Sequence, residues 1–196
     1  MSPDGTQAVV EIDSDQQGSH IWIVDLERGI HTRLSLEGSS NRNPVWTPDG
    51  GSVVFGSDRA GSIDLYLKAA DGSGAAERLA TSEHNHLPLS WSPEGPVLLF
   101  QEDHPETNAD IHMRSAEDGT TTAFIVTPAN ERGAAFSPDG HWVRMCRTSR
   151  VKRRSSWCRS RIGAAAGKSR REMPVETIRG GRVLGTSCST SADQGR

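Results

Sequence analysis

Histidine and acidic side chains that could bind a metal ion stand close together in two short segments. They are Glu83, His84 and His86 in the first segment, and Asp103, His104 and Glu106 in the second. Two histidines one residue apart become metal ligands when a carboxylate or a third histidine converges on them. Both segments are predicted to be loops, and the sequence does not show that the two loops meet. Solvated histidines are the favoured interpretation, and no metal ligand is predicted.

The segment from Gly163 to Ser169 resembles a phosphate-binding loop. The Walker pattern requires four residues between its glycines, whereas three alanines separate Gly163 from Gly167. Ile162 occupies the place of the first glycine. Nucleotide binding is therefore not predicted, and no cofactor is expected.

Nucleophilic catalysis has little support in the sequence. The run from Gly185 to Ser189 lacks the second glycine of a Gly-x-Ser-x-Gly elbow. Asp58 and Arg59 are predicted to form a local ion pair that supports their own loop. Two acidic pairs in loops are expected to be solvated: Asp13 with Asp15, and Glu102 with Asp103. We predict no catalytic residue and no enzymatic activity for this chain.

A four-residue turn recurs every 45 residues and sets the framework on which these residues stand. It reads Ser-Pro-Asp-Gly at Ser2, Thr-Pro-Asp-Gly at Thr47, Ser-Pro-Glu-Gly at Ser92 and Ser-Pro-Asp-Gly at Ser137. Proline presets φ for the second turn position, and glycine accepts the positive φ that follows. Each copy therefore predicts a hairpin between two antiparallel strands.

Apolar runs on both sides of the turn repeat with the same period. Trp46, Trp91 and Phe136 precede it, and runs such as 53–55 and 98–100 follow it. A further strand and a short fourth strand complete each unit, as in 64–67 and 78–79 for the second copy. A period of 40–45 residues with four strands per unit is typical of propeller blades.

The run from Pro44 to Leu67 carries a family resemblance. It reads Pro-x-Trp-Thr-Pro-Asp-Gly, then Val-Val-Phe-Gly-Ser-Asp-Arg-x-Gly, then Asp-Leu-Tyr-Leu. This pattern resembles the WD-repeat-like β-propeller of the TolB type, over roughly residues 2–143. Glu94, Pro96 and His112 depart from it. Such repeats occur in the periplasmic TolB protein, in prolyl-oligopeptidase-like enzymes and in sensor regions of bacterial receptor-like Ser/Thr kinases.

The resemblance implies an all-β fold in which the strand ending in Trp46 or Trp91 lines a central channel. We predict an incomplete β-propeller of about three and a half four-stranded blades, at 2–36, 41–80, 86–126 and 133–143. Propellers close with four to eight blades, so this number leaves strand edges unpaired. Met1 stands where other copies have Trp or Phe, which indicates a chain that begins inside a blade.

The segment 144–196 departs from the repeat pattern, with Arg144 at a position that is apolar in the earlier copies. Residues 1–143 carry a net charge of −14, and residues 144–196 carry +11. We predict two parts: a partial propeller at 1–143 and a basic Arg/Ser-rich tail at 144–196, irregular or disordered. A reading-frame shift near codon 144 is the favoured explanation; a genuine linker and a basic binding arm are the alternatives.

These observations favour a non-catalytic protein-interaction module with a protein or peptide partner, since rigid scaffolds present loops for binding. The alternative is an accessory or sensor propeller of a larger peptidase or kinase. A third is nucleic-acid binding through the basic tail. The sequence contains no apolar stretch long enough for a membrane span and no signal peptide. By resemblance alone, the parent protein is expected to be periplasmic or extracytoplasmic.

Overall fold

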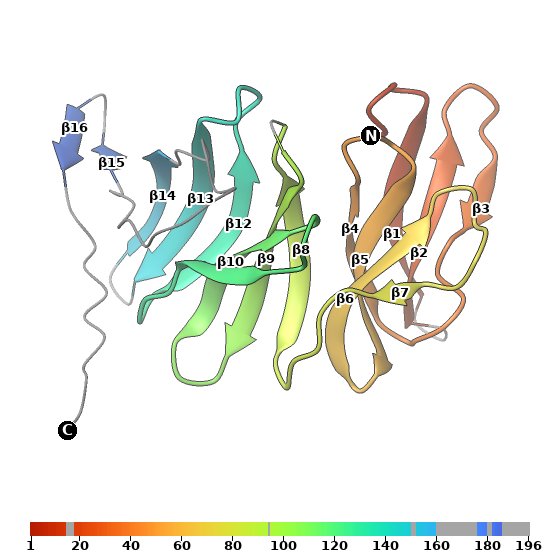
Figure 1. Cartoon of the computed structure of the whole chain (residues 1–196), viewed down its shortest axis with the longest axis horizontal. Coiled ribbons are helices and arrows are strands. Elements are labelled where there is room, and N and C mark those ends of the chain that lie inside the picture. The colour runs from red at the N-terminus through yellow and green to blue at the C-terminus, as the bar shows by residue number, and fades with distance from the viewer. Residues whose placement is uncertain (15–17, 94, 150–151, 160–175, 180–181, 186–196) are drawn as a thin grey trace.

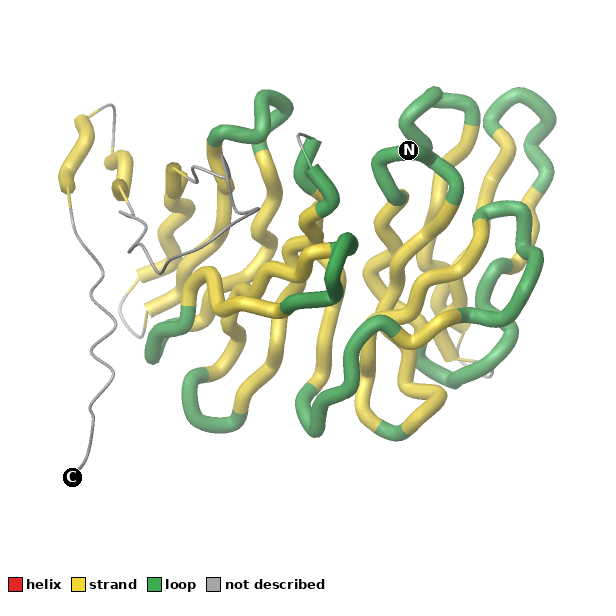
Figure 2. Tube along the Cα trace, viewed as in Figure 1, coloured by secondary structure: helices red, strands yellow, loops and turns green. Residues whose placement is uncertain are grey.

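The protein is a row of twisted antiparallel sheets, seen here in a computed structural model (Figure 1). The structure describes residues 1–14, 18–93, 95–149, 152–159, 176–179 and 182–185. Every regular element in these ranges is a strand, which confirms the all-β prediction (Figure 2). Within them, no helix is long and apolar enough to cross a membrane.

Each sheet is assembled from strands that follow one another in the sequence. The first contains β1 (Gln7–Ser14), β2 (Gly18–Asp25) and β3 (His31–Arg33). The second contains β4 (Asn41–Trp46), β5 (Ser52–Ala60), β6 (Ser62–Ala69) and β7 (Glu77–Arg78). The third contains β8 (Asn85–Trp91), β9 (Val97–His104), β10 (Asn108–Ser115) and β11 (Thr121–Ile125). The fourth contains β12 (Asn130–Phe136), β13 (Trp142–Ser149) and β14 (Lys152–Arg159), and β15 (Glu176–Arg179) pairs with β16 (Arg182–Gly185).

The recurring turn precedes β1, β5 and β13, and side-chain hydrogen bonds hold it at each of these three places. Between β4 and β5, Thr47 Oγ1 donates to Asp49 Oδ1 at 2.6 Å and accepts from the Ser52 amide at 3.0 Å. The Gly51 amide donates to the same Asp49 oxygen. Ser2 with Asp4, and Ser137 with Asp139, form the same arrangement. The repeat therefore conserves a set of hydrogen bonds as well as a turn.

A β-bulge interrupts the first strand of the second, third and fourth sheets at the same repeat position. The register shifts between Arg42 and Val45 in β4, between Pro88 and Ser90 in β8, and between Arg132 and Ala135 in β12. Asn43 and Gly133 lie inside two of these bulges with φ of 51° and 62°. Bulges of this kind bend a strand and increase its twist.

Apolar side chains fill the spaces between successive sheets. Ile21 and Ile23 of the first sheet pack with Phe55 of the second, Leu65 of the second packs with Phe100 of the third, and the third and fourth sheets share a similar cluster. Each middle sheet is thus buried on both faces, which explains its continuous apolar runs.

The first sheet has an outer face that is partly open to solvent. Val10 pairs with Trp22 across β1 and β2, and both are half-buried, while Ile12 on the same face is 41% exposed. The residues at the repeat position of Val10 are Phe55 and Phe100, and these are fully buried between sheets. The apolar side chain at this repeat position is therefore enclosed in the second and third sheets and partly exposed in the first.

Strands continue beyond Val143, where the apolar pattern predicted none. β13 runs to Ser149 and pairs with β14 from Trp142↔Arg159 to Ser149↔Lys152. Val143 and Met145 are buried in the core while Arg144 between them is exposed and lies opposite Ala135, so this strand alternates between its two faces. Much of the segment 144–196 lies outside the described residues, and its assignment as a separate tail remains a prediction.

Candidate functional site

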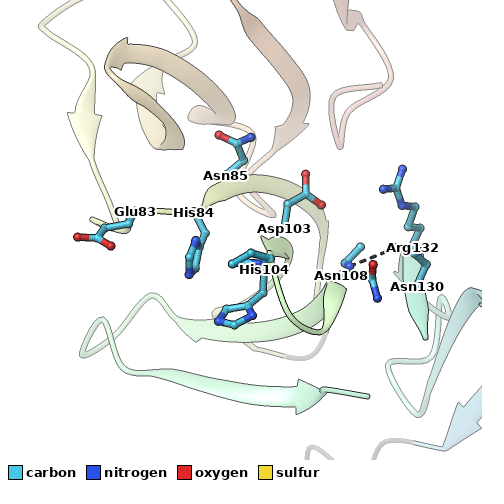
Figure 3. Close-up of a pocket in the computed structure, with 10 residues that line it drawn as sticks. Glu83, His84, Asn85, Asp103, His104, Asn108, Asn130 and Arg132 are labelled. Atoms are coloured by element: carbon cyan, nitrogen blue, oxygen red, sulfur yellow. Dashed lines mark hydrogen bonds between the residues drawn. The ribbon is translucent and has the colours of Figure 1, made fainter. Parts of the chain in front are cut away.

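An open pocket of about 440 Å³ lies at the end of the third sheet where β8 and β10 begin and β9 finishes. We call it the inter-sheet pocket because residues of the fourth sheet, at the start of β12, also line it. Its walls are mainly polar (Figure 3), with Glu83, His84, Asn85, Asp103, His104, Asn108, Asn130 and Arg132 among the lining residues.

Hydrogen bonds to backbone amides tie the sheets together at this end of the molecule. Asn85 Oδ1 accepts from the Ile63 amide of the second sheet at 3.0 Å. Asn130 Oδ1 accepts from the Ala109 amide of the third sheet at 3.3 Å. These two asparagines stand 45 residues apart in the sequence, so the repeat places the same inter-sheet contact twice. The pocket is therefore formed by strands that are hydrogen-bonded to the neighbouring sheets.

The two histidine segments meet in this pocket, and the prediction that both are loops is wrong in part, because His86 lies in β8 and Asp103 and His104 end β9. The rings of His84 and His104 pack edge to face with their centroids 4.6 Å apart. The amide of Glu106 donates to Nδ1 of His104 at 3.2 Å, so the neutral ring carries its proton on Nε2. Among the described residues, no three His, Cys, Asp or Glu side chains are arranged to hold a metal ion.

His86, the third histidine of the sequence cluster, lies between sheets and does not line the pocket. It is 4% exposed, and its Nε2 donates to Glu102 Oε2 at 2.7 Å. Its Nδ1 lies 3.9 Å from Oδ1 of the fully buried Asp64, and neither of these two atoms has a hydrogen-bond partner among the described residues. Arg78 binds the other oxygen of Asp64. The buried cluster joins the second and third sheets.

Burial and nearby charges shift the pKa values of two residues close to His86, which are Glu102 and His112. Partial burial alone would raise the pKa of Glu102, but the hydrogen bond from His86 and nearby histidines hold it below its ordinary value. Burial lowers the pKa of His112, and the carboxylates of Glu102 and Asp110 oppose this effect only in part. At neutral pH, Glu102 is therefore ionised and His112 is neutral.

Asn41, His86 and Glu131 occupy one repeat position, 45 residues apart, and all three are buried. Each lies where one sheet meets the next. Asn41 Nδ2 donates to the Ser19 carbonyl at 3.2 Å, and Glu131 Oε1 accepts from Thr127 Oγ1 at 2.6 Å. The repeat keeps a polar residue at each of these sheet boundaries while its chemistry changes. These three residues were not identified as one series from the sequence, although their spacing of 45 residues could have shown it.

Asp58 and Asp103 share a repeat position but have different surroundings. Asp58 accepts hydrogen bonds from the amides of Ser39 and Ser40 and from Ser39 Oγ. Burial on its own would raise the pKa of Asp58, and these bonds lower it below its ordinary value. His84 and Asn85 stand at the positions of Ser39 and Ser40 in the next repeat, and Asp103 instead accepts from Gln101 Nε2 at 2.7 Å. Asp103 lines the pocket, and its Oδ2 has no hydrogen-bond donor among the described residues.

Arg42 and Arg132 also share a repeat position, and their side chains differ in whether they have a hydrogen-bond partner. Arg42 Nε donates to Ser40 Oγ at 2.8 Å. The side chain of Arg132, at the same repeat position in β12, makes no hydrogen bond or ion pair with any residue that the structure describes, while its backbone pairs with Cys146. It lines the inter-sheet pocket from the side of the fourth sheet (Figure 3).

The predicted local ion pair between Asp58 and Arg59 is replaced by other contacts. Arg59 Nη1 lies 3.4 Å from Glu37 Oε2, and its guanidinium stacks over the Tyr66 ring at 4.5 Å from the centroid. Asp58 instead accepts the hydrogen bonds from Ser39 and Ser40 described above.

Several other sequence candidates fall outside this site. The acidic pair Glu102 and Asp103 is divided, because Glu102 joins His86 and Asp103 lines the pocket. The phosphate-loop-like segment 163–169 lies outside the described residues. So do Asp15 and the serines of the run after Gly185.

Comparison with known proteins supports the repeat assignment. The sequence matches the TolB beta propeller domain over residues 1–175. It is 25% identical over 183 residues to the uncharacterized peptidase YuxL of Bacillus subtilis, covering 72% of this chain and 28% of that protein. The chain thus spans well under half of that relative.

Solved structures share the fold. TolB from Acinetobacter baumannii superposes with a TM-score of 0.71 at 22% identity, covering 81% of this chain and 39% of that one. A puromycin-hydrolyzing peptidase from Mycobacterium tuberculosis gives a TM-score of 0.66 at 16% identity, covering 94% of this chain and 28% of that one. The period, the sheet order and the family match agree: this chain belongs to the TolB beta propeller domain family.

Proposed function

We propose that this chain is a non-catalytic interaction module that binds a protein or peptide partner at the inter-sheet pocket. The observation that carries the proposal is the pocket itself, about 440 Å³ in volume and lined by polar side chains from two sheets. This volume is within the usual range for ligand sites. Loops and strand ends on a rigid sheet scaffold are the usual place for binding residues.

The charge of the repeats favours a partner with basic groups. Residues 1–143 hold 22 Asp and Glu against 8 Lys and Arg. An excess of one sign raises the local concentration of oppositely charged partners and speeds their association. This supports a basic peptide or protein surface as the ligand.

Selection from a random phage-displayed peptide library tests the proposal. We expect the purified full chain to enrich Lys- and Arg-containing peptides that compete with one another for one site. Failure to enrich any peptide above the empty support, or equal capture by chain unfolded in urea, would contradict it. Peptide hydrolysis that stays proportional to this protein through successive purification steps would contradict the non-catalytic part.

The second candidate is an accessory propeller within a larger peptidase. The similarity to the peptidase YuxL and the shared fold with the mycobacterial peptidase favour it. The coding sequence on either side of this chain distinguishes the candidates, because a Gly-x-Ser-x-Gly domain there would indicate a peptidase. A kinase domain with a membrane span would indicate a receptor.

A further inference from the structure

Two oppositely charged side chains of the inter-sheet pocket are left without a charged partner in the described structure. Asp103 comes from the end of β9 and Arg132 from β12, so they belong to different sheets. They do not form an ion pair with each other. Asp103 Oδ1 accepts from Gln101, and Oδ2 has no hydrogen-bond donor among the described residues. The exposed Glu83 lines the same pocket on the side away from Arg132 (Figure 3).

The repeat itself shows that these charges could have been satisfied internally. At the equivalent positions 45 and 90 residues earlier, Asp58 is held by Ser39 and Ser40, and Arg42 is held by Ser40. In the third sheet His84 replaces Ser39, so the hydroxyl donor is absent, and the His84 amide donates to Ser82 Oγ instead. In the fourth sheet Asn130 replaces Ser40, whose hydroxyl accepts from Arg42 in the second sheet. The pocket therefore combines a carboxylate and a guanidinium that the chain engages elsewhere and leaves open here.

We propose that the inter-sheet pocket binds a peptide segment carrying both a basic and an acidic side chain. The basic group binds Asp103 with support from Glu83, and the acidic group binds Arg132. Guanidinium–carboxylate and ammonium–carboxylate hydrogen bonds are shorter and stronger than neutral ones. Placing the two opposite charges on separate sheets fixes the direction of the bound segment. This inference rests on the proposed function and specifies its ligand.

Fluorescence anisotropy with labelled synthetic peptides tests the ligand chemistry. The probes are Gly/Ser heptapeptides with blocked ends that carry Lys and Glu at separations of one to four residues. Matched probes replace Lys, Glu or both by Gln. We expect one Lys/Glu spacing to bind best, with about a fivefold loss in affinity for each charge replaced, as for a partly exposed ion pair.

Variants of the full chain that remove one charge at a time assign each charge to its partner. Asp103→Asn should abolish the preference for Lys and keep the preference for Glu, and Arg132→Gln should do the reverse. Arg42→Gln is the matched control, because Arg42 has the same repeat position outside the pocket, and it should change neither preference. Arg132→Glu should reverse the preference at the acidic position from Glu to Lys.

The outcomes separate this inference from the proposed function. The inference is overturned if Asp103→Asn and Arg132→Gln bind every probe as the wild-type chain does. It is also overturned if library-selected peptides bind while the Lys/Glu series does not, and then the interaction role stands. Absence of binding by both the library peptides and the series would overturn the two together.

Discussion

His86 Nδ1 and Asp64 Oδ1 face each other at 3.9 Å between the second and third sheets, a separation too long for a direct hydrogen bond. The bond that His86 does make, to Glu102, crosses two strands of the third sheet. Its loss would leave a partly buried carboxylate without its histidine donor. We therefore expect the hydrogen bond between His86 and Glu102 to contribute to the stability of the fold.

We expect His86→Leu to lower the free energy of unfolding by about 1–3 kcal/mol, the usual cost of unsatisfying a buried polar group. His86→Asn should cost less, because it copies the Asn41 side chain of the preceding repeat position and keeps an amide donor. Urea unfolding at pH 7 measures both. The exposed His31 on β3 supplies the control, since His31→Leu should have little effect. An unchanged His86→Leu variant would contradict the expectation.

Acid should weaken the repeat turns. Hydrogen bonds from Ser2, Thr47 and Ser137 lower the pKa values of the turn aspartates: Asp4, Asp49 and Asp139. A carboxylate with a depressed pKa in the folded state stabilises the fold above its unfolded pKa near 4, and this contribution is lost as pH falls through the folded value. Stability measured by urea titration should therefore fall progressively as the pH drops below about 4.

Thr47→Val tests that sign, because it keeps the side-chain shape and removes the hydroxyl that donates to Asp49. The variant should be less stable than wild type at pH 6 and should lose less stability on acidification. Thr47→Ser keeps the donor and should retain the wild-type pH profile. A Thr47→Val profile parallel to that of wild type would rule out this source of acid sensitivity.

Gly18 and Gly5 both have φ of 76° but differ in their surroundings. A Cβ at Gly18 would overlap the backbone of Ser39, whereas a Cβ at Gly5 has nothing within 4 Å. Gly5→Ala should cost about 1–2 kcal/mol from the left-handed conformation alone. Gly18→Ala adds overpacking of about 1–3 kcal/mol. Thermal unfolding should rank the two in that order, and equal melting temperatures would argue against the close approach.

Arg59 should matter more than its acidic partner. Glu37 is 73% exposed on its side chain, so Glu37→Ala should change stability by less than about 1 kcal/mol. Arg59 is 12% exposed and stacks on Tyr66. Arg59→Gln should cost about 0.5–1 kcal/mol more than Glu37→Ala, because it also loses the cation–π contact. A double-mutant cycle with Tyr66→Leu measures that contact directly, and a coupling near zero would assign the effect to packing.

The repeat made much of the fold predictable, because turn chemistry and apolar strands recur at a fixed spacing. Thr47 with Asp49 defines a hairpin from local residues alone, and Trp46 and Phe55 mark the buried strands on either side. The continuation of β13 past Arg144 was not predictable in this way. Buried Val143 and Met145 alternate there with exposed Arg144, and a comparison of Arg144 with the continuous apolar runs of the earlier copies does not detect this alternation.

The candidate site was harder to predict because it depends on departures from the repeat. His84 and His104 meet because β8 pairs with β9 and sets Asn85 opposite Asp103, a relation between residues about 20 apart in the sequence. Asp103 and Arg132 were not selected as a pair, since each looks like an ordinary surface charge. Comparing position 103 with 58, and position 132 with 42, would have shown which charges lose their partners.

The open outer face of the first sheet has a consequence for the behaviour of this protein in solution. Val10, Ile12 and Trp22 present water with side chains of a type that the neighbouring sheets enclose. Apolar hydration is disfavoured more strongly by sulfate and other kosmotropic salts. A polar substitution at Val10 should therefore raise the ammonium sulfate concentration at which the protein precipitates. The same substitution at the enclosed Phe55 would instead unfold the domain.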